Sequence, residues 1–92
     1  RVLCPTGLRT YPDVGVVCGA PDLEKIAGTE TLKNPSLIVE VLSPSTEAYD
    51  RGDKFDNYRT IPSLKGYMLV SQTNPHVEHF ARHDDGRWLL TG

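Results

Sequence analysis

The stretch LIVEVLSPST, residues 37–46, places a single carboxylate, Glu40, inside an apolar run. Residues 37–42 lack the alternation of a half-exposed strand, and such a run is typical of a central strand covered on both faces. A buried carboxylate is costly unless a cation, a basic side chain or a proton compensates it. The stretch therefore predicts a buried strand with a compensated acid, which ends at Ser43-Pro44 because proline lacks the N–H of a strand ladder.

The residues that follow predict a strand–helix–strand unit. Residues 47–60 have the composition of a helix, which Gly52 weakens and Pro62 closes. Residues 65–71 (KGYMLVS) then predict a second strand. A helix between two strands of one sheet makes those strands parallel, so we expect residues 65–71 to run parallel to residues 37–42.

The residues before the apolar run predict less regular structure. Residues 1–4 indicate a short strand, and Pro12 allows a strand from Asp13 to Cys18 because proline is tolerated at a strand start. Residues 19–36 are rich in Gly, Pro, Asn and charge, so we expect a surface loop with one helical turn. The predicted fold class is α/β, a mixed β-sheet with helices packed on it.

The length of 92 residues allows one small domain, 1–92. We expect a core over about 1–71 and a C-terminal β-hairpin over about 76–91, with Asp85-Gly86 at its turn. The chain opens without an initiator Met and ends abruptly, so we expect a piece of a longer protein, truncated at both ends.

Composition excludes some classes of protein. A net charge of −2 with 24% charged residues is ordinary for a globular domain, so no large basic excess indicates nucleic acid. No apolar run approaches the roughly 18 residues of a membrane span, so we expect no membrane partner. Cys4 and Cys18 form no C-x-x-C motif, which favours reduced thiols and a cytoplasmic location.

Two carboxylates are expected to lie close together in this fold. Because side chains alternate along a strand, Ile38, Glu40 and Leu42 share one face. Asp13 begins a strand that can lie beside this one, which would bring a second acid within reach. Two carboxylates with a backbone carbonyl and water form a hard, all-oxygen site suited to Mg²⁺ or Mn²⁺.

The predicted helix can add a cation to these acids. Asp50, Lys54 and Tyr58 are spaced i, i+4 and i+8, so they form one stripe. If the helix packs over the sheet, Lys54 can point its ammonium toward the carboxylates. Two acids and a lysine around one metal ion can position and activate water against a phosphodiester.

Three blocks of sequence also carry a resemblance to a known family. The blocks are YPDV (11–14), NPSLIVEVLSPST (34–46) and DRGDKFDNYRTIPSLKGYMLV (50–70), in this order. They resemble the Uma-two family of restriction endonucleases, within the PD-(D/E)XK nuclease superfamily, and the resemblance extends from Tyr11 to about Trp88. It implies a restriction-endonuclease-like mixed β-sheet flanked by helices and Mg²⁺-dependent hydrolysis of DNA, with Mn²⁺ as an alternative ion.

The resemblance also implies roles for individual residues. Asp13 matches the superfamily's first metal-binding aspartate, Glu40 matches its second acid, and the carbonyl of Val41 matches a backbone ligand. The superfamily pattern has lysine two residues after the glutamate, where this chain has Leu42. In the Uma-two family a helix lysine takes over that role, and Lys54 matches it.

Two positions of the family pattern have no firm counterpart. The superfamily usually carries a further acid on an initial helix, which would lie upstream of Arg1, so no residue here is assigned to it. Tyr58 is an accessory candidate, because its ring suits helix packing while its hydroxyl can reach the site or a phosphate.

A second class of function remains open beside the nuclease. On the same scaffold, a non-catalytic module could bind nucleic acid or protein, with Glu40 merely in a salt bridge. The basic footprint for DNA is weak, because acidic residues interleave with it. The basic residues are Arg9, Arg51, Lys54, Arg59 and Lys65, and the interleaved acids are Asp50, Asp53 and Asp56. A homodimer is also left open.

Overall fold

The computed structural model describes residues 1–91 and contains two β-sheets and two short helices. Gly92, the last residue of the predicted domain 1–92, lies outside the described residues. In chain order the elements are β1 (Val2–Leu3), β2 (Arg9–Thr10), β3 (Val14–Val16), β4 (Leu23–Ile26), β5 (Thr29–Leu32), β6 (Leu37–Leu42), α1 (Glu47–Arg51), α2 (Asp53–Tyr58), β7 (Gly66–Ser71), β8 (Val77–Arg82) and β9 (Trp88–Thr91). The mixed α/β class predicted from the sequence is therefore confirmed.

The larger sheet has five strands in the order β3-β6-β7-β8-β9. Strands β6 and β7 are parallel over their full length, as the strand–helix–strand pattern predicts, and the other pairs are antiparallel. The C-terminal hairpin of β8 and β9 is also confirmed. Strand β3 pairs with β6 in the register Val14↔Val39, so Asp13 comes directly before β3 at the level of Glu40.

The smaller sheet corrects one prediction. Residues 19–36 do not form a loop with a helical turn, because β4 and β5 make an antiparallel hairpin that joins β1 and β2 in the order β2-β1-β5-β4. The turn of this hairpin is Ala27-Gly28, and both residues have positive φ angles of 49° and 78°. Positive φ at both central residues is the geometry that a two-residue hairpin favours.

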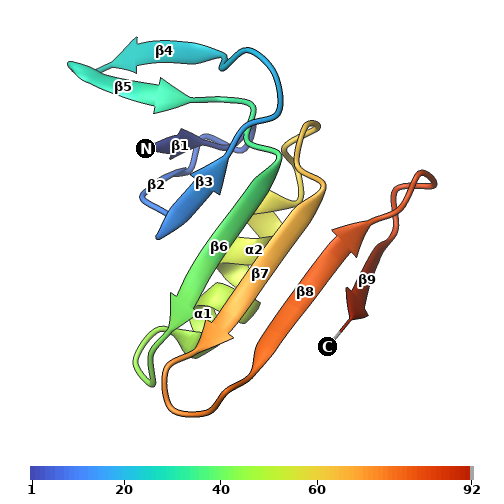
Figure 1. The fold of residues 1–92 in the computed structure, drawn as a ribbon. Coiled ribbons are helices and arrows are strands. Elements are labelled where there is room, and N and C mark those ends of the chain that lie inside the picture. The colour runs from blue at the N-terminus through green and yellow to red at the C-terminus, as the bar shows by residue number, and fades with distance from the viewer. Residues whose placement is uncertain (92) are drawn as a thin grey trace.

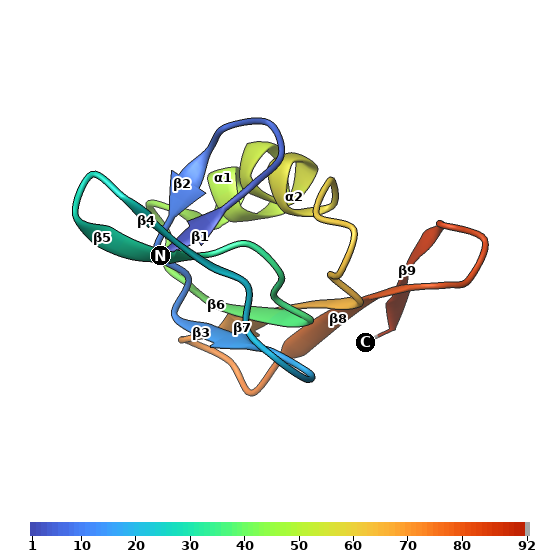
Figure 2. The same cartoon turned by 90° about the horizontal axis from the view of Figure 1, so that it is seen from above.

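The helices cover one face of the larger sheet (Figures 1 and 2). The single helix predicted over 47–60 is divided at Gly52, whose φ and ψ of −102° and −99° lie outside the helical region. The sequence identified Gly52 as the weak point, and the structure confirms that. The second segment ends at Tyr58, two residues earlier than predicted.

The hydrophobic core lies between the helices and the inner face of the larger sheet. Its buried members are Val2, Cys4, Ile38, Leu42, Phe55, Tyr58, Ile61, Leu64, Tyr67 and Leu69. The ring of Phe55 stacks on Tyr67 at 4.9 Å, lies 4.9 Å from Phe80, and meets the edge of Trp88 at 5.3 Å. Helix α2 therefore joins the parallel strands to the C-terminal hairpin.

The outer face of strand β6 corrects a second prediction. The apolar run indicated a strand covered on both faces, but residues 1–91 cover only the inner one. Ile38, Glu40 and Leu42 point inward and are buried, whereas Leu37 and Val39 are half-buried and Val41 is exposed. The β-branched and leucine side chains of that outer row form part of an apolar surface.

Two arginines connect the C-terminal hairpin to the rest of the protein. The guanidinium of Arg82 donates hydrogen bonds to the carbonyls of Ile61 and Pro62, at 3.2 and 3.0 Å, and lies 4.7 Å from the centroid of the Trp88 ring. The guanidinium of Arg51, at the end of α1, forms an ion pair with Glu78 on β8. Both contacts connect the helical layer to β8.

We expect Phe55→Ala to destabilise the protein strongly. The substitution removes a buried ring that touches three other aromatic rings, and truncations of this kind cost about 3–5 kcal/mol. Leu90→Ala is the matched control, because Leu90 is 53% exposed and its loss should cost less than about 1 kcal/mol. Urea denaturation of both variants measures the difference, and equal losses would contradict the assignment of Phe55 to the core.

The ion pair of Arg51 and Glu78 predicts a pH dependence of stability. The hydrogen bond from Arg51 lowers the pKa of Glu78 below its ordinary value of 4.5. The carboxylate therefore stabilises the fold above that value, and this contribution is lost as the pH falls through the lowered pKa. The free energy of unfolding of wild type should exceed that of Glu78→Gln near neutral pH, by less than about 1 kcal/mol because Arg51 is partly exposed.

Denaturation curves across the acidic range test this dependence. The difference between the two proteins should shrink below about pH 4.5 and close once Glu78 is protonated. Glu47→Gln is the control, because Glu47 contacts the same guanidinium at 3.2 Å from an exposed position. A difference that stays constant down to strongly acidic pH would contradict the role given to Glu78.

Candidate functional site

An acidic pocket of about 370 Å³ lies at the carboxyl end of β6, between the start of β3 and the helices. Three predicted site residues, Asp13, Glu40 and Lys54, meet in this pocket, together with Val41. The lining residues are Tyr11, Asp13, Glu40, Val41, Ser43, Thr46, Tyr49, Asp50, Lys54 and Gln72. Tyr58, the accessory candidate, lies behind this lining and contacts Glu40.

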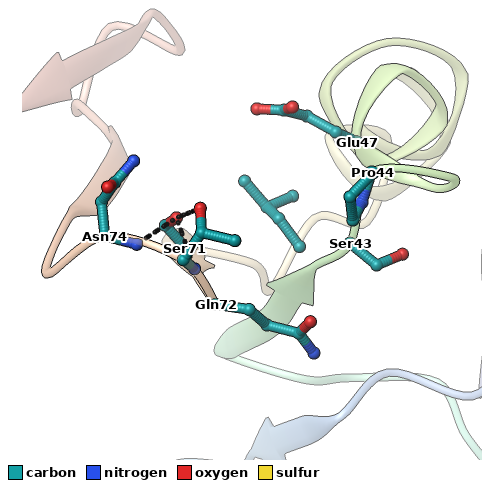
Figure 3. A pocket seen from close by; sticks show the side chains of 8 residues that line it. Ser43, Pro44, Glu47, Ser71, Gln72 and Asn74 are labelled. Carbon is teal, nitrogen blue, oxygen red and sulfur yellow. Dashed lines mark hydrogen bonds between the residues drawn. The ribbon is translucent and has the colours of Figure 1, made fainter.

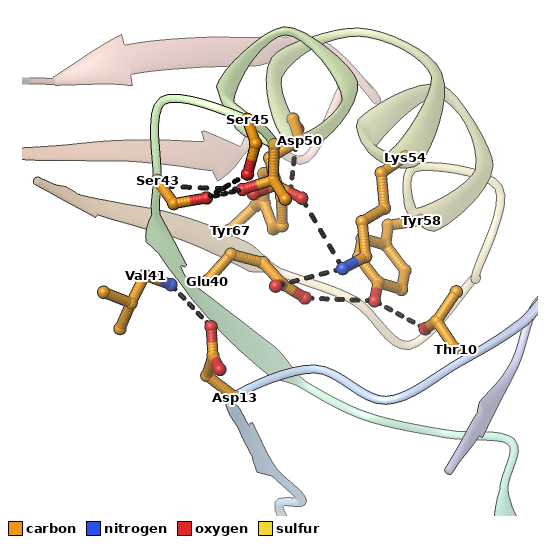
Figure 4. Close-up of polar contacts among 11 residues, drawn as sticks. Thr10, Asp13, Glu40, Val41, Ser43, Ser45, Asp50, Lys54, Tyr58 and Tyr67 are labelled. Atoms are coloured by element: carbon orange, nitrogen blue, oxygen red, sulfur yellow. Dashed lines mark hydrogen bonds and ion pairs between the residues drawn. The ribbon is translucent and has the colours of Figure 1, made fainter.

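Glu40 has a hydrogen-bonding partner on each of its carboxylate oxygens (Figure 4). The side chain is almost fully buried, with 5% of its surface exposed. The Lys54 ammonium lies 3.1 Å from Oε2, and the hydroxyl of Tyr58 donates to Oε1 at 3.2 Å. The Tyr58 hydroxyl is also 2.5 Å from Oγ1 of Thr10. The compensation that the sequence required for Glu40 is therefore present.

The compensation is nevertheless incomplete. Burial raises the pKa of Glu40, and the hydrogen bond and charge of Lys54 only partly oppose it. The charge of the nearby Asp50 raises the pKa further, whereas the Tyr58 hydrogen bond lowers it. Because the pKa stays above its ordinary value, additional positive charge near Glu40 would stabilise its ionised form.

Lys54 is shared between two carboxylates. Its ammonium lies 3.5 Å from Oδ1 of Asp50 in addition to its contact with Glu40. It also lies between two rings, 5.8 Å from the centroid of Tyr49 and 6.0 Å from that of Tyr58. Only 13% of the lysine side chain and 4% of the Asp50 side chain are exposed, so this is a buried cluster and not an ordinary surface pair.

Asp50 is the site residue that the sequence analysis did not assign. Its backbone carbonyl accepts a hydrogen bond from the Tyr67 hydroxyl at 2.9 Å, which ties α1 to β7. The available signal was its i, i+4 spacing to Lys54, a spacing that is equally common on solvent-exposed helix faces. The burial that distinguishes it depends on how the helices pack.

Asp13 reaches the same pocket through the main chain of β6. Its Oδ2 accepts a hydrogen bond from the backbone N–H of Val41 at 2.7 Å. The N–H and C=O of one strand residue point to the same side, so the carbonyl of Val41 faces the edge where Asp13 lies. Figure 4 shows the Asp13 carboxylate pointing to this backbone, whereas that of Glu40 points toward Lys54 and Tyr58.

The charge of the pocket suits a hard cation. Three carboxylates, those of Asp13, Glu40 and Asp50, line the pocket with one ammonium, that of Lys54, so the lining carries an excess of two negative charges. Within residues 1–91, no three His, Cys, Asp or Glu side chains are grouped to hold a metal ion by themselves. Mg²⁺ commonly binds through one or two carboxylates and keeps several waters, and Asp13 and Glu40 provide acids of that number on the pocket lining.

The predicted basic footprint is dispersed over the molecule. Arg51 pairs with Glu78 and Glu47, and Arg59 lies 5.3 Å from the centroid of the Phe55 ring. Lys65 lines an apolar groove on the outer face of the sheet. Of the five basic residues predicted to attract DNA, Lys54 alone lines the acidic pocket.

The chain is similar in sequence to known proteins. Two uncharacterized proteins of Synechocystis sp., slr1290 and sll1609, are 48% identical to it over 81 residues and 46% identical over 84 residues. Each alignment covers 88% of the chain, but only 41% and 45% of the respective relative. The chain thus spans less than half the length of these curated relatives.

No solved structure matches the chain significantly. Among residues 1–91, no helix is long and apolar enough to cross a membrane. A family model described as "Putative restriction endonuclease" matches the whole chain, residues 1–92. The chain therefore belongs to the Uma2 family, as its three sequence blocks predicted.

Proposed function

We propose that the protein is a Mg²⁺-dependent endonuclease that hydrolyses phosphodiester bonds of DNA, with Mn²⁺ as an alternative ion. Family membership supports a nuclease. The observation that carries the proposal further is the acidic pocket, where Asp13, Glu40 and Lys54 meet and negative charge is in excess. A divalent cation there would balance that excess and offset the raised pKa of Glu40.

In this proposal Asp13 and Glu40, with the carbonyl of Val41, hold the cation. When bound, Mg²⁺ supplies a Lewis acid that polarises the phosphoryl oxygen and favours deprotonation of water. Lys54 donates a hydrogen bond to the attacking water or to the negative charge that develops on the phosphate. Its contacts with Glu40 and Asp50 hold the ammonium at the pocket wall.

Tyr58 is a positioning residue in this scheme. Burial raises its pKa far above the ordinary value, so the phenol stays protonated and acts only as a hydrogen-bond donor to Glu40. Thr10 holds the same hydroxyl from the smaller sheet. These two contacts fix the direction of the Glu40 carboxylate.

The proposal also covers the cellular location and the partner of the protein. Cys4 is buried, Cys18 is exposed, and both are free thiols, which suits the reducing cytoplasm. DNA is the proposed partner. Each copy carries Asp13, Glu40 and Lys54 on its own chain, so the scheme does not require a homodimer.

A non-catalytic binding module is the second candidate function. One observation favours it: both carboxylate oxygens of Glu40 already have partners, as in a purely structural salt bridge. In that case the acidic cluster would fix the helices on the sheet, and the surface would only bind nucleic acid or protein. Metal binding and cleavage distinguish the two candidates.

We expect Asp13→Asn and Glu40→Gln each to weaken Mn²⁺ or Mg²⁺ binding at least about tenfold, because each removes one of two anionic ligands. Isothermal titration calorimetry of the full-length protein measures the affinity. Asp56→Asn is the matched control, since Asp56 is an exposed acid on the same helical layer and should leave the affinity unchanged. Unchanged affinity in both site variants would exclude the proposed metal site.

We expect Lys54→Ala to retain metal binding but to slow cleavage by about 10²-fold or more, the loss typical of one preorganised stabilising group. Lys54→Arg should rescue cleavage poorly, because a planar fork does not replace a compact ammonium. Single-turnover cleavage of supercoiled plasmid at saturating Mg²⁺ measures the rates. Lys25→Ala, at an exposed lysine of β4, is the control.

The outcomes of this experiment separate the two functions. Equal rates for wild type and Lys54→Ala would remove Lys54 from the mechanism. A wild-type protein that binds the metal ion but cleaves no DNA would favour the non-catalytic module. Circular dichroism of Lys54→Ala checks that the buried acids, now without their ammonium, have not unfolded the protein.

A further inference from the structure

Two tyrosines expose their rings at the mouth of the acidic pocket. Tyr11 is 71% exposed and lies between β2 and β3, two residues before Asp13. Tyr49 is 44% exposed and lies on α1, directly before Asp50. Both line the pocket that contains Glu40. Neither belongs to the hydrophobic core, and both present part of their ring surface to solvent.

The surroundings restrict the backbone of Tyr11 and give the Tyr49 ring a cationic neighbour. Tyr11 precedes Pro12, which disfavours the helical backbone conformation for the tyrosine, and it follows Thr10, whose hydroxyl is bound to Tyr58. The Tyr49 ring lies over the Lys54 ammonium at 5.8 Å. A tyrosine side chain has only two rotatable χ angles, so it loses little entropy when a ligand stacks on its ring.

A second hollow of about 210 Å³ adjoins the acidic pocket and shares Ser43 and Gln72 with it (Figure 3). Its lining is mostly neutral and polar, and its residues are Leu42, Ser43, Pro44, Glu47, Ser71, Gln72, Thr73 and Asn74. Hydroxyl and amide groups of this kind can hydrogen-bond both phosphate oxygens and base edges. The two hollows together make one polar floor beside the tyrosines.

Charge on this floor does not favour the backbone of duplex DNA. Lys54 is the one basic residue that lines either hollow, and Glu47 adds a fourth carboxylate to those of the acidic pocket. Duplex binding depends mainly on basic side chains that neutralise closely spaced phosphates. Stacking on an aromatic ring is a contact that unpaired bases can make and paired, stacked bases of a duplex cannot, because every free base presents a π-face.

We propose that Tyr11 and Tyr49 form a stacking site for unpaired bases next to the phosphate that is cleaved. The substrate class is then DNA with a single-stranded segment, whose strand crosses the polar floor between Gln72 and Ser43. The inference rests on the proposed nuclease function for the position of the scissile phosphate. The stacking itself requires neither metal nor cleavage.

The test measures binding by the full-length protein without metal. Fluorescence anisotropy in EDTA compares a labelled oligothymidine with a duplex of the same length. We expect the single strand to bind more tightly, and Tyr11→Ala and Tyr49→Ala each to weaken that binding about tenfold or more, as expected when one stacked base loses its ring. Tyr11→Phe and Tyr49→Phe keep the ring and should bind as wild type does.

A control variant and the cleavage assay make the result decisive. Leu90→Ala removes an exposed apolar side chain of β9 and should leave the affinity for the single strand unchanged. Unchanged single-strand affinity in both alanine variants would overturn the stacking site, even if the wild type cleaves plasmid. Conversely, loss of single-strand binding in these variants would support the stacking site even if the wild type cleaves no DNA with any divalent ion. Only the nuclease proposal would then fail.

Discussion

The buried contact between Glu40 and Lys54 is the interaction on which the rest of the site depends. It joins the inner face of β6 to α2 across the core, with an N···O distance of 3.1 Å. Removing either partner would leave the other charged and buried, which is typically far more costly than removing both. A buried ion pair adds little net stability compared with a well-packed apolar pair of the same volume. Net stability alone therefore does not account for the presence of this pair at the wall of a pocket.

The same contact determines how charge is distributed around the pocket. Lys54 cannot neutralise Glu40 and Asp50 completely, and Asp13 adds a third carboxylate from the neighbouring strand. Burial of Glu40 adds to this shortage of positive charge, because the pKa of Glu40 remains raised despite the lysine. The pocket lining is thus complementary to a cation. A substrate that binds through stacking and hydrogen bonds would contact a positive charge of the pocket only at its reacting phosphate.

The sequence predicted those elements whose pattern reflects the core. The apolar run around Glu40, the parallel strand at 65–71 and the C-terminal hairpin all have inward-facing residues or a defined turn, and they are present. The hairpin of β4 and β5 was missed because β4 is largely exposed and the two strands carry Glu24, Lys25 and Glu30 instead of an apolar alternation. The register of β3 against β6, which brings Asp13 level with Glu40, depends on pairing between strands far apart in sequence. Local patterns cannot fix such a register.

The position of the lysine on a helix follows from the packing of β6. The inward-facing side chains of this strand are Ile38, Glu40 and Leu42, and Leu42 is only 7% exposed within the core. A lysine at position 42 would share this face and would have to bury its stem and its charge among apolar side chains. From α2, by contrast, Lys54 places its ammonium beside the Glu40 carboxylate, while Leu42 packs in the core. Asp50, four residues earlier on α1, adds a second anionic contact at 3.5 Å that helps hold this ammonium over the carboxylate of the strand.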